Sequence, residues 1–338
     1  MNNSFLISIC IPSYNRPKEL SRLLNSIEST QKKKIQIVIC EDQSPKRLEI
    51  RSVVENFQQN NAFNLKYSEN VNNLGHGGNF RECIKNADGE YIVFMGDDDM
   101  FIPGKIDFYC NFIENNLDSG YILRSSRQLL QNGDYEYFKY YSSDKTFPPG
   151  IKTYTDFFLK SVFMSGFTIK RSLVENIKES SLDDTLLFQL YLMAEVCLNY
   201  PSSYCNTPIV QGVGEGISFF GTNEKEKEFY TPGQLVSNNI NFIKGFLRIA
   251  NFVDAKYNIN SYEIIKLEMS KYSYPLMSNE RGFGRKQFIK HCKALRKIGL
   301  DTSIYFNIYY VALLVFGDPI CKRVIFLVKK IIGRRIRL

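Results

Sequence analysis

The 338-residue chain is long enough for one large domain or two smaller ones, and 44% of its residues are hydrophobic. With 26 Phe and 21 Tyr it can bury a sizeable core, which excludes an intrinsically disordered chain. The net charge is +8, but residues 289–338 hold 11 Lys and Arg against two Asp, so they carry +9 and the remainder −1. A near-neutral body argues against nucleic-acid binding, so we look for the cause of the basicity in the C-terminal segment.

The Cys and His residues narrow the possible chemistry. None of the eight Cys forms a C-x-x-C pair, and Cys10 and Cys40 lie in apolar runs. We therefore expect buried, reduced thiols in a cytosolic protein. The two His residues, His76 and His291, leave little room for a histidine-based metal site. No basic region precedes the short apolar run 5–11, so we expect no signal peptide.

Strands and helices are expected to alternate along the first hundred residues. Apolar runs predict buried strands at 5–11, 35–40, 65–68 and 91–95, and apolar spacing of three and four predicts helices from 17, around 50–57 and around 80–87. Asn15 is a plausible N-cap for the first helix. Residues 69–78 are expected to form a loop. This order predicts an α/β fold with a mostly parallel sheet and helices on both faces.

Polar residues follow each of these strands. Ligands bind at the carboxyl ends of parallel strands, which here correspond to residues 12–15, 41–44, 70–78 and 97–99. The fourth end carries Asp97, Asp98 and Asp99. Adjacent carboxylates repel one another unless a cation lies among them, and oxygen ligands suit Mg²⁺ or Mn²⁺. A solvated turn is the alternative on residue types alone.

The remaining elements are less regular. A helix is expected after Pro103, strands at 121–123 and 167–169, and a helix near 186–193 that follows Asp183 and Asp184. The glycine-rich residues 212–216 predict either a flexible flap, whose backbone N–H groups are available to phosphate, or a plain turn. We place domains at 1–220 and 221–338, the second mainly helical.

Four motifs, in this order, resemble glycosyltransferase family 2, whose members are sugar-nucleotide-dependent transferases with the GT-A fold. They are Pro-Ser-Tyr-Asn-Arg at 12–16, Glu41-Asp42 after a strand, Asn73-Leu-Gly75 before a helix that leads to Gly89-Glu-Tyr-Ile, and the acidic triplet followed by Pro103. A weaker fifth match is Asp183-Asp184 with Leu187 after it. The resemblance covers about residues 5–215.

The resemblance implies a donor site. It places Pro12, Tyr14 and Asn15 along the nucleotide, with Tyr14 near the base. Asp42 would hydrogen-bond the base or its ribose. Asn73 and Gly75 would belong to the same site. The implied cofactors are Mn²⁺ or Mg²⁺ and a nucleotide-sugar donor linked to UDP, CDP, GDP or dTDP.

The resemblance also implies roles for the acids. Alignment through Pro103 puts Gly96 where the family has the first acid of an Asp-x-Asp-Asp run, which leaves open which two acids of the triplet act. We favour Asp98 as the metal ligand, supported by Asp99, with Asp97 beside the ribose or sugar. Asp184 is the candidate base in an inverting transfer. The alternative is that Asp183 and Asp184 only cap a helix.

The C-terminal tail combines apolar and basic residues. Residues 304–316 are apolar apart from Asn307, but 13 residues are fewer than the roughly 20 needed to span a bilayer. Basic residues interleave with apolar ones between 322 and 337, a pattern typical of a helix on an anionic membrane surface. A packed C-terminal helix with a solvated basic face and nucleic-acid binding are the alternatives.

Together these features predict a metal-dependent inverting glycosyltransferase in surface-polysaccharide synthesis, similar to O-antigen and capsule sugar transferases, abequosyltransferase-like proteins among them. Its partners would be the donor, a saccharide or lipid-linked saccharide acceptor, and an anionic membrane surface at the cytoplasmic face of the bacterial cell membrane, with no nucleic acid. One alternative is a nucleotidyltransferase, although no Gly-x-Gly-x-Arg loop follows the first strand. The other is a non-catalytic nucleotide-sugar-binding scaffold.

Overall fold

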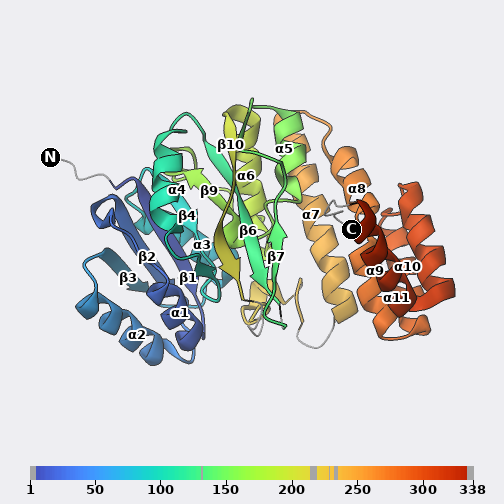
Figure 1. The fold of residues 1–338 in the computed structure, drawn as a ribbon, viewed down its shortest axis with the longest axis horizontal. Coiled ribbons are helices and arrows are strands. Elements are labelled where there is room, and N and C mark those ends of the chain that lie inside the picture. The colour runs from blue at the N-terminus through green and yellow to red at the C-terminus, as the bar shows by residue number, and fades with distance from the viewer. Residues whose placement is uncertain (1–4, 131, 214–218, 228, 232–234, 333–338) are drawn as a thin grey trace. The chain divides into compact units, whose positions relative to one another are not determined.

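The computed structural model describes residues 5–130, 132–213, 219–227, 229–231 and 235–332. The chain divides into two compact units, Met1–Glu228 and Phe229–Leu338. The first unit is an α/β domain and the described part of the second is helical (Figure 1). Each unit is described by itself.

The first four long strands of the sheet are parallel. They are β1 (Ile7–Ser13), β2 (Ile35–Glu41), β3 (Asn64–Glu69) and β4 (Tyr91–Phe94), in the order β3-β2-β1-β4. Ser13 lies opposite Glu41 in the register of β1 and β2, so these strands end side by side. The apolar runs of β1, β2 and β4 are buried on both faces, as continuous hydrophobic runs in parallel sheets are.

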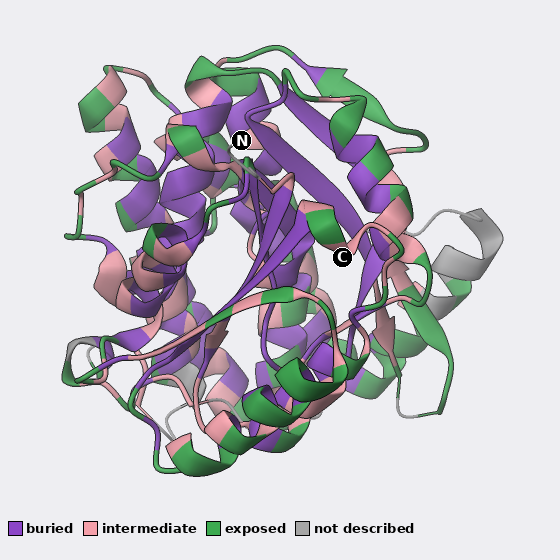
Figure 2. Ribbon diagram, turned by 90° about the vertical axis from the view of Figure 1, so that its left-hand side faces the viewer, coloured by how far each residue is buried: buried purple, intermediate pink, exposed green. Residues whose placement is uncertain are grey.

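Helices cover both faces of this half of the sheet, as the sequence predicts. The helices are α1 (Pro17–Asn25), α2 (Arg47–Asn60), α3 (Gly75–Asn86) and α4 (Lys105–Glu114). Ile9 of β1 shares one core with apolar residues of α1, α2 and α4. Its neighbour Cys10 points to the other face, where its thiol bonds the carbonyl of Cys83 on α3 at 3.6 Å. Figure 2 shows the buried strands between helices whose outer faces are exposed.

Beyond β4 the sheet is mixed and not mostly parallel. Here β9 (Phe167–Lys170) runs antiparallel between β4 and β6 (Tyr121–Leu129), and β10 (Ser202–Gly212) runs parallel to β6. The shorter strands β5 (Met100–Phe101), β7 (Tyr135–Phe138) and β8 (Lys145–Phe147) pair antiparallel, and α5 (Ile151–Phe158) and α6 (Phe188–Asn199) complete the unit. β10 was not predicted from the sequence, and its register shifts between Cys205 and Val210, around Pro208.

In its described residues the second unit consists of α7 (Leu235–Tyr257), α8 (Tyr262–Lys271), α9 (Tyr274–Gly282), α10 (Arg285–Lys297) and α11 (Ile304–Ile332). Gly317 interrupts α11 with φ 77° and ψ 170°, and Pro319 follows it. By length and composition alone, Ile304–Ile325 could cross a membrane. This stretch includes the break at Gly317, so the expectation that residues 304–316 are too few to span a bilayer stays a prediction.

Candidate active site

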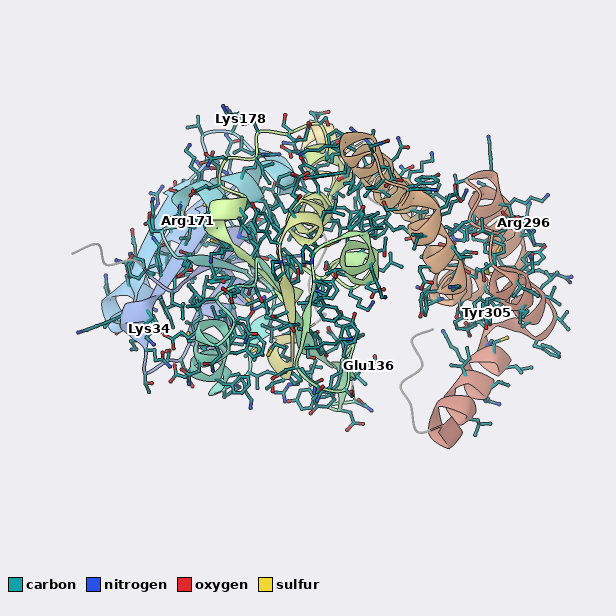
Figure 3. The ribbon with its side chains drawn as sticks, turned by 90° about the horizontal axis from the view of Figure 1, so that it is seen from above. Lys34, Glu136, Arg171, Lys178, Arg296 and Tyr305 are labelled. Atoms are coloured by element: carbon teal, nitrogen blue, oxygen red, sulfur yellow. The ribbon has the colours of Figure 1, made fainter. Side chains whose placement is uncertain are left out.

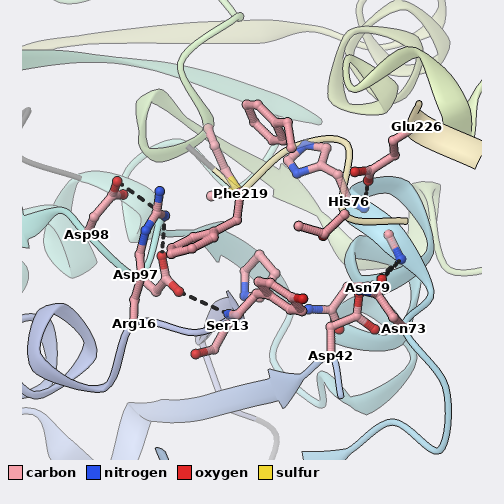
Figure 4. Close-up of a pocket in the computed structure, with 16 residues that line it drawn as sticks. Ser13, Arg16, Asp42, Asn73, His76, Asn79, Asp97, Asp98, Phe219 and Glu226 are labelled. Carbon is pink, nitrogen blue, oxygen red and sulfur yellow. Dashed lines mark hydrogen bonds and ion pairs between the residues drawn. The ribbon is translucent and has the colours of Figure 1, made fainter. Parts of the chain in front are cut away.

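A cavity of about 350 Å³ opens where β1, β2 and β4 end. It is lined by Pro12, Ser13, Tyr14, Arg16, Asp42, Asn73, Gly75, His76, Asn79, Asp97, Asp98, Met164, Phe219, Phe220, Thr222 and Glu226. Asp97, Asp98 and Arg16 lie at one end of the close-up in Figure 4, and Asp42, Asn73 and Asn79 lie at the other. The cavity is therefore acidic and cationic at one end and rich in carboxylate and amide groups at the other.

Asp97 connects the end of β4 to the loop after β1. One carboxylate oxygen accepts the backbone N–H of Tyr14 at 3.1 Å, and the other accepts Arg16 at 2.8 Å. Burial raises the pKa of Asp97 to about 6, and Asp98 adds to this, while Arg16 opposes it. Both oxygens thus have protein partners, and Asp97 fixes the motif that carries Tyr14.

Asp98 and Asp99 differ in their access to the cavity. The Asp98 side chain is 31% exposed, and one of its oxygens lies 3.2 Å from Arg16. Asp99 is buried, receives a hydrogen bond from Ser165 and does not line the cavity. Ser165 also accepts the N–H of Gly96 at 2.8 Å. Burial raises the pKa of Asp99 to about 7, and the charge of Asp98 contributes.

Asp98 and Asp99 each bring one carboxylate oxygen close to Gly96. A Cβ at Gly96 would lie 3.0 Å from Asp98 Oδ1 and 3.1 Å from Asp99 Oδ2. Carboxylate oxygens are the ligands that a hard divalent cation prefers. Asp98 offers its carboxylate to the cavity, where a diphosphate and water would supply further ligands. No group of three or more His, Cys, Asp or Glu arranged to hold a metal occurs in the described parts of the chain. The residues present therefore fit a metal site that the substrate completes.

At the opposite end, two neighbouring acids take different roles. Glu41 is buried and accepts the N–H of Ser44 at 2.6 Å and Arg47 Nε at 2.7 Å, which fixes the turn into α2. Asp42 instead faces the cavity and accepts the N–H groups of Leu74 and Gly75 at 2.8 and 2.9 Å. Burial raises the pKa of Asp42, and these hydrogen bonds partly offset the rise.

The glycine-rich residues after β3 are the first turn of α3, which begins at Gly75, and not part of a loop that extends to residue 78. The N–H of His76 is bound at 2.5 Å by the carboxylate of Glu226, whose other oxygen accepts Gly221 N–H at 3.0 Å. Asn223 donates to the carbonyl of Asn73 at 2.7 Å. These contacts fix residues 221–226 against the start of α3, beside Asp42.

An aromatic wall completes the cavity. Phe219 lies edge-on to Tyr14, with ring centroids 5.8 Å apart, and its ring lies 5.3 Å from the guanidinium of Arg16. Phe220 packs edge-on against His76 at 5.5 Å. Phe219, Phe220 and Glu226 were not predicted from the sequence as site residues. The sequence signal that could have indicated the two Phe residues is their position side by side soon after the glycine-rich residues 212–216. No sequence pattern marks Glu226 as a site residue.

Most of the predicted donor-site residues meet in this cavity. Pro12, Tyr14, Asp42, Asn73, Gly75, Asp97 and Asp98 all line it. Asn15 does not, and it is not the N-cap: it adopts φ 60°, and Arg16 precedes the first residue of α1. The predicted glycine-rich element at 212–216 lies largely outside the described residues.

Asp184 lies outside the cavity lining, in a short 3₁₀ helix, Asp183–Thr185, that packs against the start of α3. The α carbon of Asp183 would lie 2.7 Å from a Cβ at Gly77. Asp183 itself is bound by Arg81, at 2.9 Å from Nε. α6 begins only at Phe188, and the preceding Leu187 offers no side-chain cap, so the two acids do not cap that helix.

Two solved structures share the architecture. A mannosyltransferase from Pyrobaculum calidifontis, PcManGT, in complex with GDP-Man and Mn²⁺ matches 94% of this chain and 80% of its own, with a TM-score of 0.54 and 13% identity. Staphylococcus aureus TarS 1–349 in complex with UDP-GlcNAc matches 94% and 91%, with a TM-score of 0.51 and 15% identity. At these identities the likeness shows the fold, which is GT-A-like with added C-terminal helices.

Curated relatives match about a third of the chain. Abequosyltransferase RfbV of Salmonella typhimurium is 31% identical over 113 residues, which cover 33% of this chain and 34% of that protein. A GalNAc(5)-diNAcBac-PP-undecaprenol beta-1,3-glucosyltransferase of Campylobacter jejuni is 31% identical over 101 residues, or 30% and 32%. The matches thus cover about a third of the length of these relatives.

Both of these relatives are named as sugar transferases. The family description "Glycosyl transferase family 2" matches residues 8–174. Residues 8–174 thus match the family that the four motifs resemble, which confirms the resemblance.

Proposed function

We propose that this chain transfers a sugar from a nucleotide-sugar donor to a hydroxyl group of a saccharide acceptor. The observation that carries the proposal is the two-ended cavity at the carboxyl ends of β1, β2 and β4. One end offers acceptors for a base and ribose, and the other offers the carboxylates and the guanidinium that a diphosphate and its cation require.

The base and ribose are assigned to the end that holds Asp42. Asp42 is positioned by backbone N–H groups of Leu74 and Gly75, so its carboxylate is oriented before a ligand arrives. The Tyr14 ring provides an aromatic face beside Phe219. Ser13 Oγ is buried and has no hydrogen-bond partner within the described ranges, so it is available to a ligand. TarS with UDP-GlcNAc and PcManGT with GDP-Man are relatives in fold that bind such donors.

The diphosphate and its cation are assigned to the end that holds Asp98. Asp98 and Asp99 would hold Mn²⁺ or Mg²⁺, and Mn²⁺ occurs in the PcManGT complex. When bound, the cation supplies neutralisation of the charge that grows on the leaving diphosphate. Arg16 is placed to contribute a second positive charge, because it already contacts Asp98 at 3.2 Å. Asp97 holds Arg16 and Tyr14 and would lie beside the ribose or sugar.

The transfer is proposed to be a direct displacement with inversion. The acceptor oxygen forms a bond to the anomeric carbon as the bond from that carbon to the diphosphate oxygen breaks, and the electron pair leaves with the diphosphate. Asp184 takes the proton of the acceptor hydroxyl. Its place beside the α3 start, whose first residues line the cavity, supports this role.

The acceptor is proposed to be a lipid-linked saccharide of surface-polysaccharide synthesis such as O-antigen or capsule, at the cytoplasmic face of the membrane. Two relatives support this: an abequosyltransferase, and a glucosyltransferase whose name specifies an undecaprenol-diphosphate-linked saccharide. The family match favours sugar transfer over nucleotidyl transfer.

A thermal-shift screen of UDP, CDP, GDP and dTDP, each with and without Mn²⁺, tests the donor site. We expect one nucleotide to raise the melting temperature, and more strongly with Mn²⁺. Asp98→Asn should remove the Mn²⁺-dependent part, whereas Asp118→Asn, the same change at an exposed acid outside the cavity lining, should keep it. Lack of stabilisation by every nucleotide would refute the proposed site.

Product analysis separates the alternatives. With the matching sugar nucleotide and a hydroxyl acceptor, glycosyl transfer releases a nucleoside diphosphate. Pyrophosphate release from a nucleoside triphosphate and a sugar phosphate would identify a nucleotidyltransferase. Tight nucleotide binding without any product would identify a non-catalytic scaffold.

A further inference from the structure

The first limb of α11, residues 304–316, presents an apolar stripe to solvent. Ile304, Ile308, Val311 and Val315 are between 52% and 72% exposed. Their spacing of four, three and four places them on one side of a helix. Residues 304–316 carry no charge. An exposed apolar face of this kind marks an interaction surface.

The opposite side of this limb packs on its own unit. Phe306 and Leu313 are fully buried. Tyr310 stacks on Phe288 of α10 at 5.5 Å, and the Arg296 guanidinium lies 4.2 Å from the Tyr310 ring. Arg296 of α10 and Tyr305 of the first limb are labelled in Figure 3. The stripe is therefore the outer face of a helix whose inner face is part of the core.

The second limb, residues 318–332, carries another stripe. Ile320, Val324 and Leu327 are between 51% and 56% exposed and follow one another at four and three residues. Arg323, beside them, is exposed as well. In an unbroken helix, at about 100° per residue, this second stripe would lie on the side opposite the first. The non-helical backbone of Gly317 removes that constraint.

The break is built into the packing of α9 and α11. Arg281 of α9 donates to the carbonyl of Leu313 at 2.9 Å. Ser278, also on α9, donates to Asp318, which in turn accepts Lys322 at 2.8 Å. Carbonyl and carboxylate groups at the break thus have partners, and the change of direction is a fixed feature of the fold.

Charge decides what covers these stripes. Residues 289–338 carry +9, and the remainder of the chain −1. A second copy would bring another positively charged segment against this one, with Lys322 and Arg323 exposed on the second limb, which opposes a homodimer through this face. An anionic bilayer offers the opposite charge, worth about 1 kcal/mol per nearby Lys or Arg, and an apolar layer for the stripes. A spanning helix is disfavoured because its inner face holds α9 and α10, with their charged residues, against it.

We propose that α11 is an in-plane membrane anchor, whose two apolar stripes enter the interfacial layer of an anionic bilayer on either side of the Gly317 break. The inference deepens the proposed membrane location and rests on that part of the proposed function. It does not depend on the transfer chemistry.

Sedimentation of the full chain with lipid vesicles tests the anchor. We expect binding to vesicles of phosphatidylcholine with one quarter phosphatidylglycerol, and weak binding to phosphatidylcholine alone. Salt at 0.5 M should weaken the anionic binding, because the Debye length then falls to about 4 Å. Extraction with alkaline carbonate should release the protein.

Single substitutions test each stripe. Val311→Ser on the first limb and Leu327→Ser on the second should each lower the partition into anionic vesicles about tenfold, since each removes one inserted apolar side chain. The matched controls are Val71→Ser and Leu48→Ser in the first unit, which are 83% and 73% exposed and should bind as the wild type does. All four changes lie at exposed sites, so melting temperatures should be unchanged.

Several results would overturn the anchor. Unchanged partition of Val311→Ser or of Leu327→Ser would remove that stripe from the membrane contact. Resistance to carbonate would mean that α11 spans the bilayer. A concentration-dependent dimer that Val311→Ser disrupts would make the face a contact between copies. Thermal stabilisation by a nucleotide, measured in parallel, tests the donor site alone. A variant that loses vesicle binding but keeps this stabilisation has lost the membrane contact and not the donor site.

Discussion

The three adjacent acids of the triplet have different surroundings. Asp97 is held by Arg16 and the backbone of Tyr14, and Asp99 is held by Ser165. Asp97 and Asp98 both line the cavity, but the Asp98 side chain is 31% exposed and the Asp97 side chain only 5%. The acid that can approach an incoming diphosphate most directly is therefore Asp98, and its neighbours position the chain on both sides of it.

Asp184 offers a test of base catalysis at the residue scale. We expect Asp184→Asn to lower the turnover number by about 10²–10⁴-fold, because the amide cannot accept the acceptor proton. Donor affinity should stay within about threefold of the wild type, since Asp184 does not line the cavity. Steady-state kinetics together with donor titration measures both. An equal loss of donor affinity and of turnover would show that Asp184 supports the fold around α3.

His76 predicts a pH dependence of stability. Burial lowers its pKa from 6.5 to about 4, so the folded protein favours the neutral imidazole. Below about pH 6.5 the His76 imidazole of the unfolded chain binds a proton that the folded protein does not bind. The free energy of unfolding is therefore unaffected by His76 above pH 6.5 and decreases as the pH falls towards 4.

The measurement is urea unfolding at pH 7 and pH 5 for the wild type and for His76→Gln. The wild type should lose about 1–2 kcal/mol more than the variant between these values. Carboxylates titrate in both proteins and cancel in the difference. Identical losses would show that His76 titrates normally in the folded protein.

Among the elements, α3 depends on close approach of two backbones. Gly77→Ala would place a Cβ 2.7 Å from the α carbon of Asp183, so either α3 or the 3₁₀ helix has to move. We expect a loss of about 1–3 kcal/mol in the free energy of unfolding. Gly282→Ala at the end of α9 is the control, since its Cβ would meet nothing within 4 Å. Urea denaturation that gave equal stability for both variants would contradict the packing of α3.

Elements with continuous apolar runs were predictable from sequence, and elements fixed by distant contacts were not. β1, β2 and β4 are buried on both faces, so their composition alone identifies them. The first turn of α3 contains three glycines, which have poor helix propensity, and the N–H of His76 is held by Glu226, 150 residues further along. Local patterns carry no trace of that contact.

At the scale of the whole molecule, the site also combines residues that could be predicted from sequence with residues that are placed by distant contacts. The strand order puts Tyr14, Asp42 and Asp98 at adjacent strand ends, so sequence reasoning could expect them together. Phe219 and Glu226 reach the cavity from a segment that follows β10, a strand the sequence analysis missed. Which of three adjacent acids is exposed depends on Arg16 and Ser165, 81 and 66 residues from their partners.

The division of the chain into two units predicts that the first unit can bind nucleotide without the second. Every residue that lines the cavity lies at or before Glu226, within the first unit. A chain shortened to residues 1–228 should therefore fold and bind the stabilising nucleotide with Mn²⁺ within about threefold of the full-length affinity, less than about 1 kcal/mol.

The same shortened chain should lose binding to anionic vesicles, because the +9 segment and α11 are absent from it. Circular dichroism, nucleotide titration and vesicle sedimentation on one preparation measure the three properties. A folded fragment that no longer binds nucleotide would show that the second unit contributes to the donor site. A folded fragment that still binds anionic vesicles would place the membrane contact in the first unit. Apolar contacts would then have to hold it, because residues 1–228 carry a net charge of −5.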